Sequence, residues 1–131
     1  IADRVMMPGV LRDPARYIRL FDIFALSSDS EQYPIALLEA MTSALPVVST
    51  DVGDVKNIVA RENRPFIVPR TDEASLAQAI RELTNDAGLR EKLGTANRAL
   101  ACALYDEETM FARYRQLYGS AMKRADFARQ S

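Results

Sequence analysis

The sequence contains no histidine and no tryptophan, and Cys102 is its single cysteine. The lack of histidine excludes His-based catalytic triads, histidine general bases and histidine metal sites, and one cysteine cannot supply a Cys/His zinc site. We therefore expect no metal centre and no intramolecular disulfide. Cys102 lies on a stripe of small residues, which predicts a buried, inert side chain. An unpaired cysteine also fits a reducing compartment.

Long hydrophobic runs and an excess of basic charge are also missing. No apolar run approaches the roughly 20 residues of a membrane-spanning helix. The 17 basic and 18 acidic residues give a net charge of -1, which lacks the basic footprint of a nucleic-acid-binding protein. A length of 131 residues, of which 48% are hydrophobic, fits a single domain over residues 1–131 with a real core. We expect cytoplasmic localisation and no nucleic-acid partner.

The N-terminal half alternates short apolar runs with helical patterns. Runs that are short, almost continuously apolar and bounded by Pro, Gly, Ser or Asp are typical of strands buried on both faces of a parallel sheet. Alternating strands and helices predict right-handed crossovers with helices on both faces. The predicted strands, about four in all, are Val5–Met7, Ile23–Leu26, Val47–Ser49 and Phe66–Val68.

Helix signals separate these strands and fill the C-terminal half. Asp13 followed by Pro14 predicts an N-cap and a first helical residue, Pro34 predicts a second start, and Val55–Val59 predicts a short helical turn. Periodic apolar stripes predict three further helices over residues 71–86, 88–106 and 106–124, with Thr71 or Asp72 capping the first. The predicted fold is therefore α/β, with a partial Rossmann-like parallel sheet, flanking helices and a helical C-terminal half.

One feature of the second helix is unexpected. From Pro34 to Met41 the pattern is apolar nearly all round, which predicts burial, yet Glu39 lies in its middle and Glu31 lies just before it. An ionised carboxylate in such a helix is costly unless a partner pairs with it or hydrogen-bonds to it. Either the protein satisfies Glu39 internally or a ligand does.

The position of this helix in the predicted fold points to a ligand site. Residues 23–41 form a strand–loop–helix unit, and ligands of open parallel sheets bind outside the carboxyl ends of the strands. The free N–H groups of Ile35 and Ala36 would make an anion site suited to phosphate. Glu31 and Glu39 would instead accept hydrogen bonds from ribose or sugar hydroxyls. The alternative reading is that Glu31 is a solvated loop charge and that Glu39 caps neighbouring backbone.

The phrase around these glutamates resembles a known family. "DPARYIRLFDIFALSSDSEQYPIALLEAMTSALPVVSTDVGD" is similar to the signature of retaining, nucleotide-sugar-dependent glycosyltransferases with the GT-B fold, of the family 4 or group 1 type. "RPFIVPRTDEASLAQAIRELTND" resembles the family's last strand and the following helix, and "LREKLGTANRALACALYDEETMFARYRQLY" resembles its terminal helices. The resemblance covers essentially the whole chain. It implies the C-terminal, donor-binding part of such an enzyme.

The resemblance also implies roles for individual residues. Glu31 matches the first glutamate of the family's paired-glutamate motif, which implies a catalytic position at the donor sugar's hydroxyls. Glu39 matches the second, which implies hydrogen bonds to the ribose, with Leu38 packing against the same ring. Backbone N–H groups would hold the sugar and diphosphate, and one segment would lie along the base. Those donor-binding residues are Gln32, Tyr33, Pro34, Ile35 and Ala36 for the backbone groups, and Met7, Pro8 and Gly9 for the base.

Three positions depart from the family pattern. Gln32 and Ala44 stand where the family usually has glycine, and Asp54 replaces a frequent second glycine after Gly53. Ala44 is tolerated if its φ is negative. Gln32 is compatible with a different donor, a shifted loop or a lower activity.

The resemblance sets expectations about substrates and partners. The donor would be a UDP- or GDP-sugar, transferred without a metal or other cofactor to a glycan or lipid-linked hydroxyl acceptor bound through an N-terminal domain. The family's upstream basic residues and first strands are not in this sequence, so we expect this chain alone to be inactive and its open sheet edge to favour self-association. A peripheral position at the inner face of a membrane is an option for the parent protein. The alternatives are a non-catalytic nucleotide or sugar-phosphate binding module and a flavodoxin-like regulatory domain.

Overall fold

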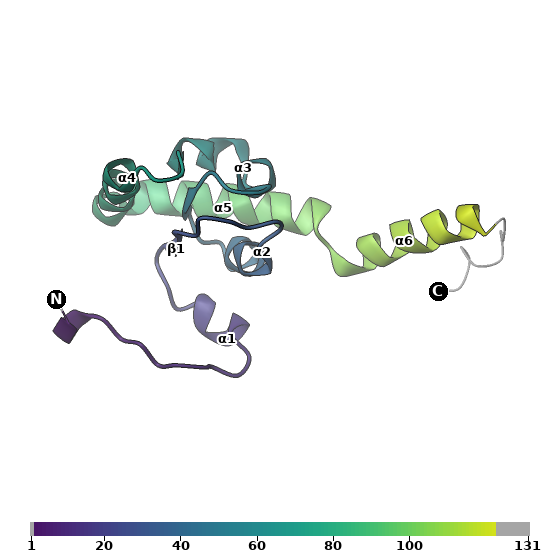
Figure 1. Cartoon of the computed structure of the whole chain (residues 1–131), viewed down its shortest axis with the longest axis horizontal. Coiled ribbons are helices and arrows are strands. Elements are labelled where there is room, and N and C mark those ends of the chain that lie inside the picture. Colours follow the sequence, from purple (N-terminus) through teal and green to yellow (C-terminus); the bar gives the residue numbers. More distant parts are fainter. Residues whose placement is uncertain (1, 123–131) are drawn as a thin grey trace.

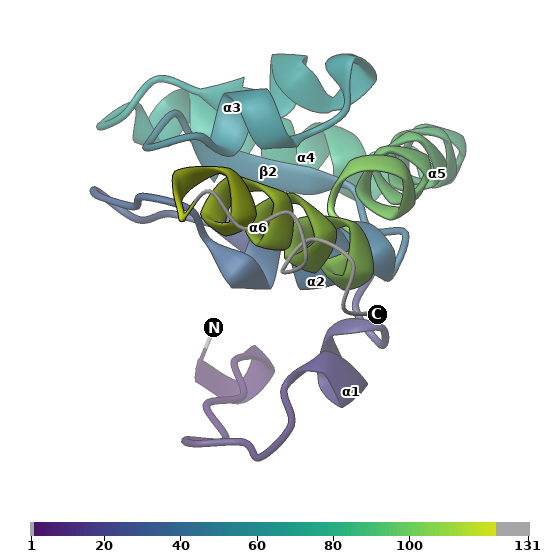
Figure 2. The same cartoon turned by 90° about the vertical axis from the view of Figure 1, so that its right-hand side faces the viewer.

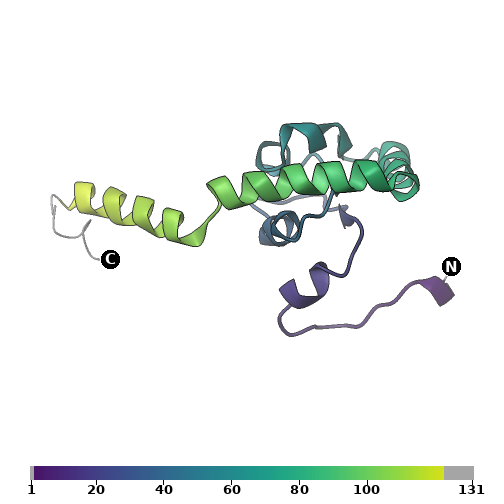
Figure 3. The same cartoon turned by 180° about the vertical axis from the view of Figure 1, so that it is seen from behind.

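The structure is a computed structural model that describes residues 2–122, and Figure 1 shows its helices and strands in chain order. A three-stranded sheet and its covering helices form the body, and the last helix extends away from it (Figures 1 and 3). The elements are η1 (Ala2–Arg4), α1 (Ala15–Ile18), β1 (Phe24–Leu26), α2 (Ile35–Thr42), β2 (Val47–Thr50), α3 (Val55–Ile58), η2 (Arg61–Phe66), β3 (Ile67–Val68), α4 (Glu73–Asn85), α5 (Ala87–Leu104) and α6 (Glu107–Ala121).

The sheet is parallel, with strand order β1-β2-β3, which confirms the predicted α/β class. Phe24 lies opposite Val47, and Ser49 lies opposite Ile67. The prediction of a strand over Val5–Met7 was wrong, because these residues form an exposed irregular segment. A strand exists only by pairing with a neighbour, and no strand of the described chain lies beside this segment.

The core lies on both faces of β2, and all four residues of this strand are buried. Val47 packs on the face covered by α2, α3 and part of α5, whereas Val48 packs on the face covered by α4. In the end-on view of Figure 2, helices surround β2, while α1 and the N-terminal segment lie outside them. The fully buried side chains that cover the two faces include Leu37, Met41, Val55 and Ile58 on the first, and Leu83 and Leu93 on the second.

Two buried asparagines connect β2 to α5 and η2. The Asn63 side chain accepts a bond from the Val47 N–H at 2.9 Å and donates to the Val47 carbonyl at 2.7 Å. The Asn97 side chain donates to the Leu45 carbonyl at 3.0 Å and to Asn63 Oδ1 at 2.8 Å, and it accepts from the Ala60 N–H at 3.1 Å. Both asparagines are fully buried, so these bonds replace the water that their polar groups would otherwise need.

The helix predictions differ from the structure in several details. The first helix begins after Pro14, and Asp13 does not cap it, because Asp13 has a φ of 59° and forms an ion pair with Arg16. Cys102 is exposed on α5, so the prediction that it is buried was wrong. Asp72 is confirmed as the cap of α4 through its bond from the Ser75 N–H, which holds the pKa of the Asp72 carboxyl below its usual value. The part of the last predicted helix beyond residue 122 lies outside the described residues.

The end of α2 places an alanine in a conformation that favours glycine. The Leu45 N–H donates to the Ala40 carbonyl and the Ala44 N–H donates to the Met41 carbonyl, both at 3.0 Å, which is the Schellman pattern. Ala44 therefore has a φ of 59°, and the condition that its φ be negative is not met.

We expect the substitution Ala44→Gly to stabilise the fold. Removing the Cβ relieves the left-handed strain and should raise the free energy of unfolding by about 1 kcal/mol. Urea unfolding followed by circular dichroism measures this. The control is Ala99→Gly in the middle of α5, where the same change should lower the free energy of unfolding by about 1 kcal/mol. A loss of stability in both variants would contradict the assignment of strain to Ala44.

Candidate functional site

The loops that follow β1, β2 and β3 meet at the carboxyl edge of the sheet. We name residues 27–34, which connect β1 to α2, the β1–α2 loop. Two of its carbonyls are held from the other strands. The Thr50 hydroxyl at the end of β2 donates to the Ser28 carbonyl at 2.6 Å, and Arg70 Nη1, beyond β3, donates to the Asp29 carbonyl at 3.2 Å.

The turn after β2 supports the same loop from a third direction. The Asp54 N–H donates to the Gln32 carbonyl at 3.2 Å. Gly53 has a φ of 52°, and a Cβ at this position would collide with the Glu31 and Gln32 carbonyls. Glycine is therefore required at position 53 both by its backbone conformation and by the close approach of the β1–α2 loop.

The Glu31 side chain is held inside the β1–α2 loop. The Ser28 hydroxyl donates to Glu31 Oε1 at 2.8 Å, and Glu31 is half-buried. This bond uses one lone pair of one carboxylate oxygen and leaves the other oxygen free to accept further bonds. The reading of Glu31 as a freely solvated loop charge therefore does not describe this position.

Glu39 lies on α2 and is half-buried. Among residues 2–122, no hydrogen bond or ion pair joins a protein group to its carboxylate. The sequence left two ways to satisfy this carboxylate, a partner within the protein or a ligand. The described part of the chain supplies no protein partner. Water and a ligand hydroxyl remain as its partners.

The N-terminus of α2 has free amides, as predicted. Pro34 occupies the N-cap position in an extended conformation, and Leu37 is the first residue whose N–H bonds back, to the Pro34 carbonyl at 3.1 Å. Within residues 2–122, no acceptor bonds the N–H groups of Ile35 and Ala36. The arrangement can therefore place two N–H donors near an anion at the sheet edge. Gln32 precedes them with a negative φ, a conformation that does not require glycine.

Tyr33 and Leu38 lie in a groove beside this helix. The groove has a volume of about 560 Å³, and the two residues face the end of α5 and the first turns of α6 across it. Tyr33 meets Tyr105 edge-on, with ring centroids 6.4 Å apart. Partial burial and the neighbouring Tyr105 hydroxyl raise the pKa of the Tyr33 phenol. The remaining lining residues are Leu104, Met110, Arg113, Tyr114 and Leu117.

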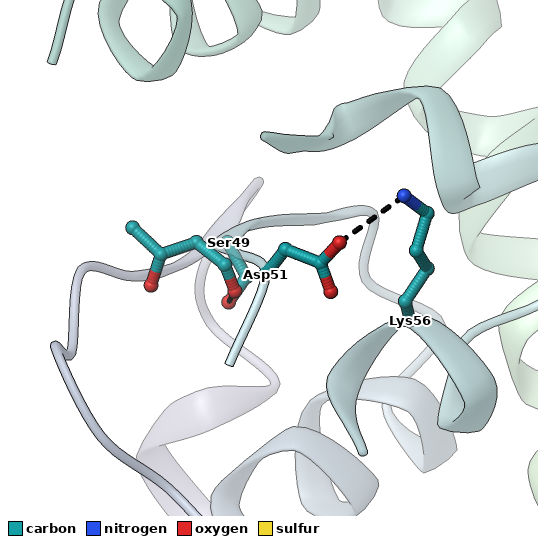
Figure 4. Close-up of polar contacts among 4 residues, drawn as sticks. Ser49, Asp51 and Lys56 are labelled. Carbon is teal, nitrogen blue, oxygen red and sulfur yellow. Dashed lines mark hydrogen bonds and ion pairs between the residues drawn. The ribbon is translucent and has the colours of Figure 1, made fainter. Parts of the chain in front are cut away.

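An ion pair occupies the turn after β2. Lys56 reaches from α3 toward Asp51, and its ammonium lies 3.1 Å from Asp51 Oδ2. Figure 4 marks this contact with a dashed line. The Asp51 N–H also donates to the Val68 carbonyl at 2.7 Å. Both contacts lie in the turn that carries Gly53 and Asp54, the residues that approach the β1–α2 loop.

The structure does not bring the segment Met7–Gly9 to this edge. Met7 is 88% exposed, and Figures 1 and 3 show the N-terminal segment running away from the sheet. Its role at a base stays a prediction. The roles predicted for Glu31, Gln32–Ala36, Leu38 and Glu39 stay predictions too, but the structure collects these residues on one strand–loop–helix unit.

Sequence reasoning missed Ser28, which holds the Glu31 carboxylate within the β1–α2 loop, and it missed Thr50 and Arg70, which hold the loop itself. Hydroxyl residues at the carboxyl ends of two neighbouring parallel strands were the available signal for the first two. For residues 2–122, no group of three or more Asp, Glu or Cys side chains is arranged to hold a metal ion. No helix in this part of the chain has the length and apolar character needed to cross a bilayer.

Comparisons with known proteins agree with this architecture. The family model described as glycosyl transferases group 1 matches residues 1–86. N-acetyl-alpha-D-glucosaminyl L-malate synthase of Bacillus anthracis is 24% identical over 123 residues, covering 94% of this chain and 32% of its own length. Alpha-D-kanosaminyltransferase of Streptomyces kanamyceticus is 29% identical over 107 residues, covering 80% of this chain and 28% of its own length.

A solved structure extends the likeness to three dimensions. Sucrose-phosphate synthase from Thermosynechococcus elongatus superimposes with a TM-score of 0.79 at 29% identity, covering 90% of this chain and 31% of that one. The chain thus spans about a third of the length of the relatives it matches. The matched sequence, the parallel sheet and the superposition together show that this chain belongs to the glycosyl transferases group 1 family and has the GT-B type of fold.

Proposed function

We propose that this chain forms a donor-binding part of a retaining glycosyltransferase that uses a nucleoside-diphosphate sugar. In this proposal Glu31 contacts the hydroxyls of the sugar being transferred, and Glu39 contacts the ribose. The N–H groups of Ile35 and Ala36 face the diphosphate, and Leu38 packs near the ribose. The acceptor is a hydroxyl of a glycan or lipid-linked molecule, bound mainly by parts of the enzyme beyond this chain.

One observation carries the proposal. Glu39 is a half-buried carboxylate without a protein partner in the described chain, on a helix whose N-terminus has free amides at the sheet's carboxyl edge. A carboxylate that accepts from ribose hydroxyls and amides that donate to phosphate match the two ends of a nucleoside diphosphate. Membership of the glycosyl transferases group 1 family supports the same assignment.

The charges of the site suit the proposed chemistry. Glycosyl transfer passes through an oxocarbenium-like state in which positive charge develops on the sugar ring while the leaving diphosphate gains negative charge. A fixed carboxylate at Glu31 stabilises the first charge, and N–H groups at the start of α2 stabilise the second. Neither of these contributions requires a bound metal, so we propose a metal-independent reaction. We also propose that transfer takes place in the cytoplasm.

Titration calorimetry with UDP and GDP tests the proposal. Wild-type chain should bind one of the two nucleotides, and Glu39→Gln should weaken that binding about tenfold, because the neutral amide loses charge-assisted bonds to the ribose hydroxyls. Glutamine preserves the size of the side chain, so the loss reports on charge and hydrogen bonding.

The matched control is Glu91→Gln, which changes an exposed glutamate on α5 and should leave the affinity unchanged. If wild type and Glu39→Gln bind the nucleotide equally well, Glu39 has no place in the site. If wild type binds neither nucleotide, the chain is not a donor-binding unit by itself and the proposal fails for this chain.

A further inference from the structure

We infer that Thr50 and Ser28 are positioning residues that fix the carboxylate of Glu31 through two consecutive hydrogen bonds. Arg70 supports the same loop from the turn after β3. The inference rests on the proposed function for its meaning, because it assigns these residues to the sugar end of the donor site. None of the three is assigned a contact with the sugar itself.

The first bond connects the sheet to the loop. Thr50 is 6% exposed at the end of the central strand, and its hydroxyl donates to the Ser28 carbonyl at 2.6 Å. β2 is the best-packed strand of the sheet, with both flanking strands paired to it. The Thr50 hydroxyl therefore fixes the start of the β1–α2 loop relative to this well-packed strand.

The second bond connects the loop to the carboxylate. The Ser28 hydroxyl donates to Glu31 Oε1 at 2.8 Å across one turn of the loop. A glutamate side chain has three rotatable bonds, and an unrestrained one loses up to about 2 kcal/mol of rotamer entropy when it is ordered. Because Ser28 already holds one oxygen, Glu31 is ordered before a sugar arrives, and its second oxygen is free for that sugar.

Arg70 contributes at the next residue of the loop. Its Nη1 donates to the Asp29 carbonyl at 3.2 Å, although Arg70 follows β3, which is the edge strand opposite β1. Two successive carbonyls of the loop are thus held by side chains from other parts of the sheet. Thr50 at the end of β2 holds the Ser28 carbonyl, and Arg70 after β3 holds the Asp29 carbonyl. Two independent anchors restrict both translation and rotation of the segment that carries Glu31.

This arrangement makes a specific prediction about ligands. The two bonds act on Glu31 and not on Glu39, which is held by the α2 helix. Losing them should weaken binding of the sugar part of a donor and spare binding of the nucleotide part. A merely structural role of Thr50 or Ser28 would weaken both by the same factor or would only lower the melting temperature.

The test compares UDP with UDP-glucose and GDP with GDP-mannose on the 131-residue chain. We expect Ser28→Ala and Thr50→Val to raise the Kd of the preferred sugar nucleotide about fivefold and the Kd of its nucleoside diphosphate less than about twofold, as for one lost hydrogen bond. Thr50→Ser keeps the hydroxyl and should restore the sugar-nucleotide affinity. Thr84→Val is the matched control, since the Thr84 hydroxyl also donates to a backbone carbonyl, that of Ile80, on α4.

A second measurement needs no ligand. Amide hydrogen exchange at Asp54, whose N–H donates to the Gln32 carbonyl of the loop, should become at least about threefold faster in Thr50→Val and Arg70→Met. It should not change in Thr84→Val or in Arg81→Met, an exposed position on α4. Unchanged exchange in the first two variants would overturn the positioning role, as would equal losses of sugar-nucleotide and nucleotide binding. If wild type binds no nucleotide, the proposed function fails, while the exchange rates still decide whether the bonds hold the loop.

Discussion

We expect the substitution Gly94→Ala to lower the free energy of unfolding by about 3 kcal/mol, because the added methyl group has no space. Gly94 is buried in α5 where this helix crosses the turn between α2 and β2. A Cβ at this position would overlap the Ala44 carbonyl oxygen and would lie 2.7 Å from the carbonyl carbon. Both atoms belong to the backbone, so neither can rotate away as a side chain would.

The loss should exceed the intrinsic gain from replacing glycine in a helix. Alanine is favoured over glycine by about 1 kcal/mol at an unhindered helical position. The clash must offset this gain as well, so its cost is larger than the net loss of stability. Separating α5 from α2 would also strain the bonds of Asn97, which lies one turn further along the same helix. Urea unfolding monitored by circular dichroism gives the free energy, and the slope of the transition shows whether the native state has changed.

Gly88→Ala provides the control on the same helix. A Cβ at Gly88 would meet only the Asp86 Oδ1 atom, at 3.5 Å, which is an ordinary contact. We therefore expect Gly88→Ala to leave stability unchanged or to raise it by up to about 1 kcal/mol. Similar losses of stability at positions 88 and 94 would contradict the claim that Gly94 is needed for the close approach of α5 to the turn after α2.

Asn97→Ala should destabilise the fold by about 4 kcal/mol, the largest effect that we expect. The Asn97 side chain satisfies the Ala60 N–H and the Leu45 carbonyl, and it donates to Asn63 Oδ1. Each buried polar group left without its partner costs about 1–3 kcal/mol, and the truncated side chain leaves a small cavity. Asn97 is fully buried, so bulk water cannot replace the lost bonds without local opening.

A double-mutant cycle with Asn63→Ala separates the two asparagines. The bond from Asn97 to Asn63 Oδ1 is lost in either single variant, so the two losses should fail to add by about 1 kcal/mol. Asn85→Ala, at the exposed last residue of α4, is the control and should change stability by less than about 0.5 kcal/mol. Additive losses in the double variant would mean that the bond between the two amides contributes nothing.

The sequence predicted the elements whose formation depends on neighbours nearby in the chain. The helix start at Pro34, the cap at Asp72 and the apolar face of α4 were all visible, because capping and periodicity are local properties. The strands at residues 24–26, 47–50 and 67–68 were also found, since apolar runs bounded by turn residues are required by a sheet buried on both faces.

The errors concern features that depend on distant neighbours. Residues 5–7 have a strand-like composition but no paired strand, and Cys102 lies on the outer side of α5 although its surroundings in sequence are small and apolar. Ala44 is a different case, because its positive φ belongs to the local Schellman pattern that ends α2, and alanine is not a residue that signals this conformation. Composition alone did not reveal these environments.

The sequence by itself determined the order of the helices and of the three paired strands, and the two glutamates on one strand–loop–helix unit. Only the tertiary structure decided that the Glu39 carboxylate has no protein partner in the described chain and that Thr50, Ser28 and Arg70 hold the loop of Glu31. The reason is physical: propensity and capping act over a few residues, whereas hydrogen bonds between strand ends depend on how residues 22 or 41 positions apart are brought together by packing.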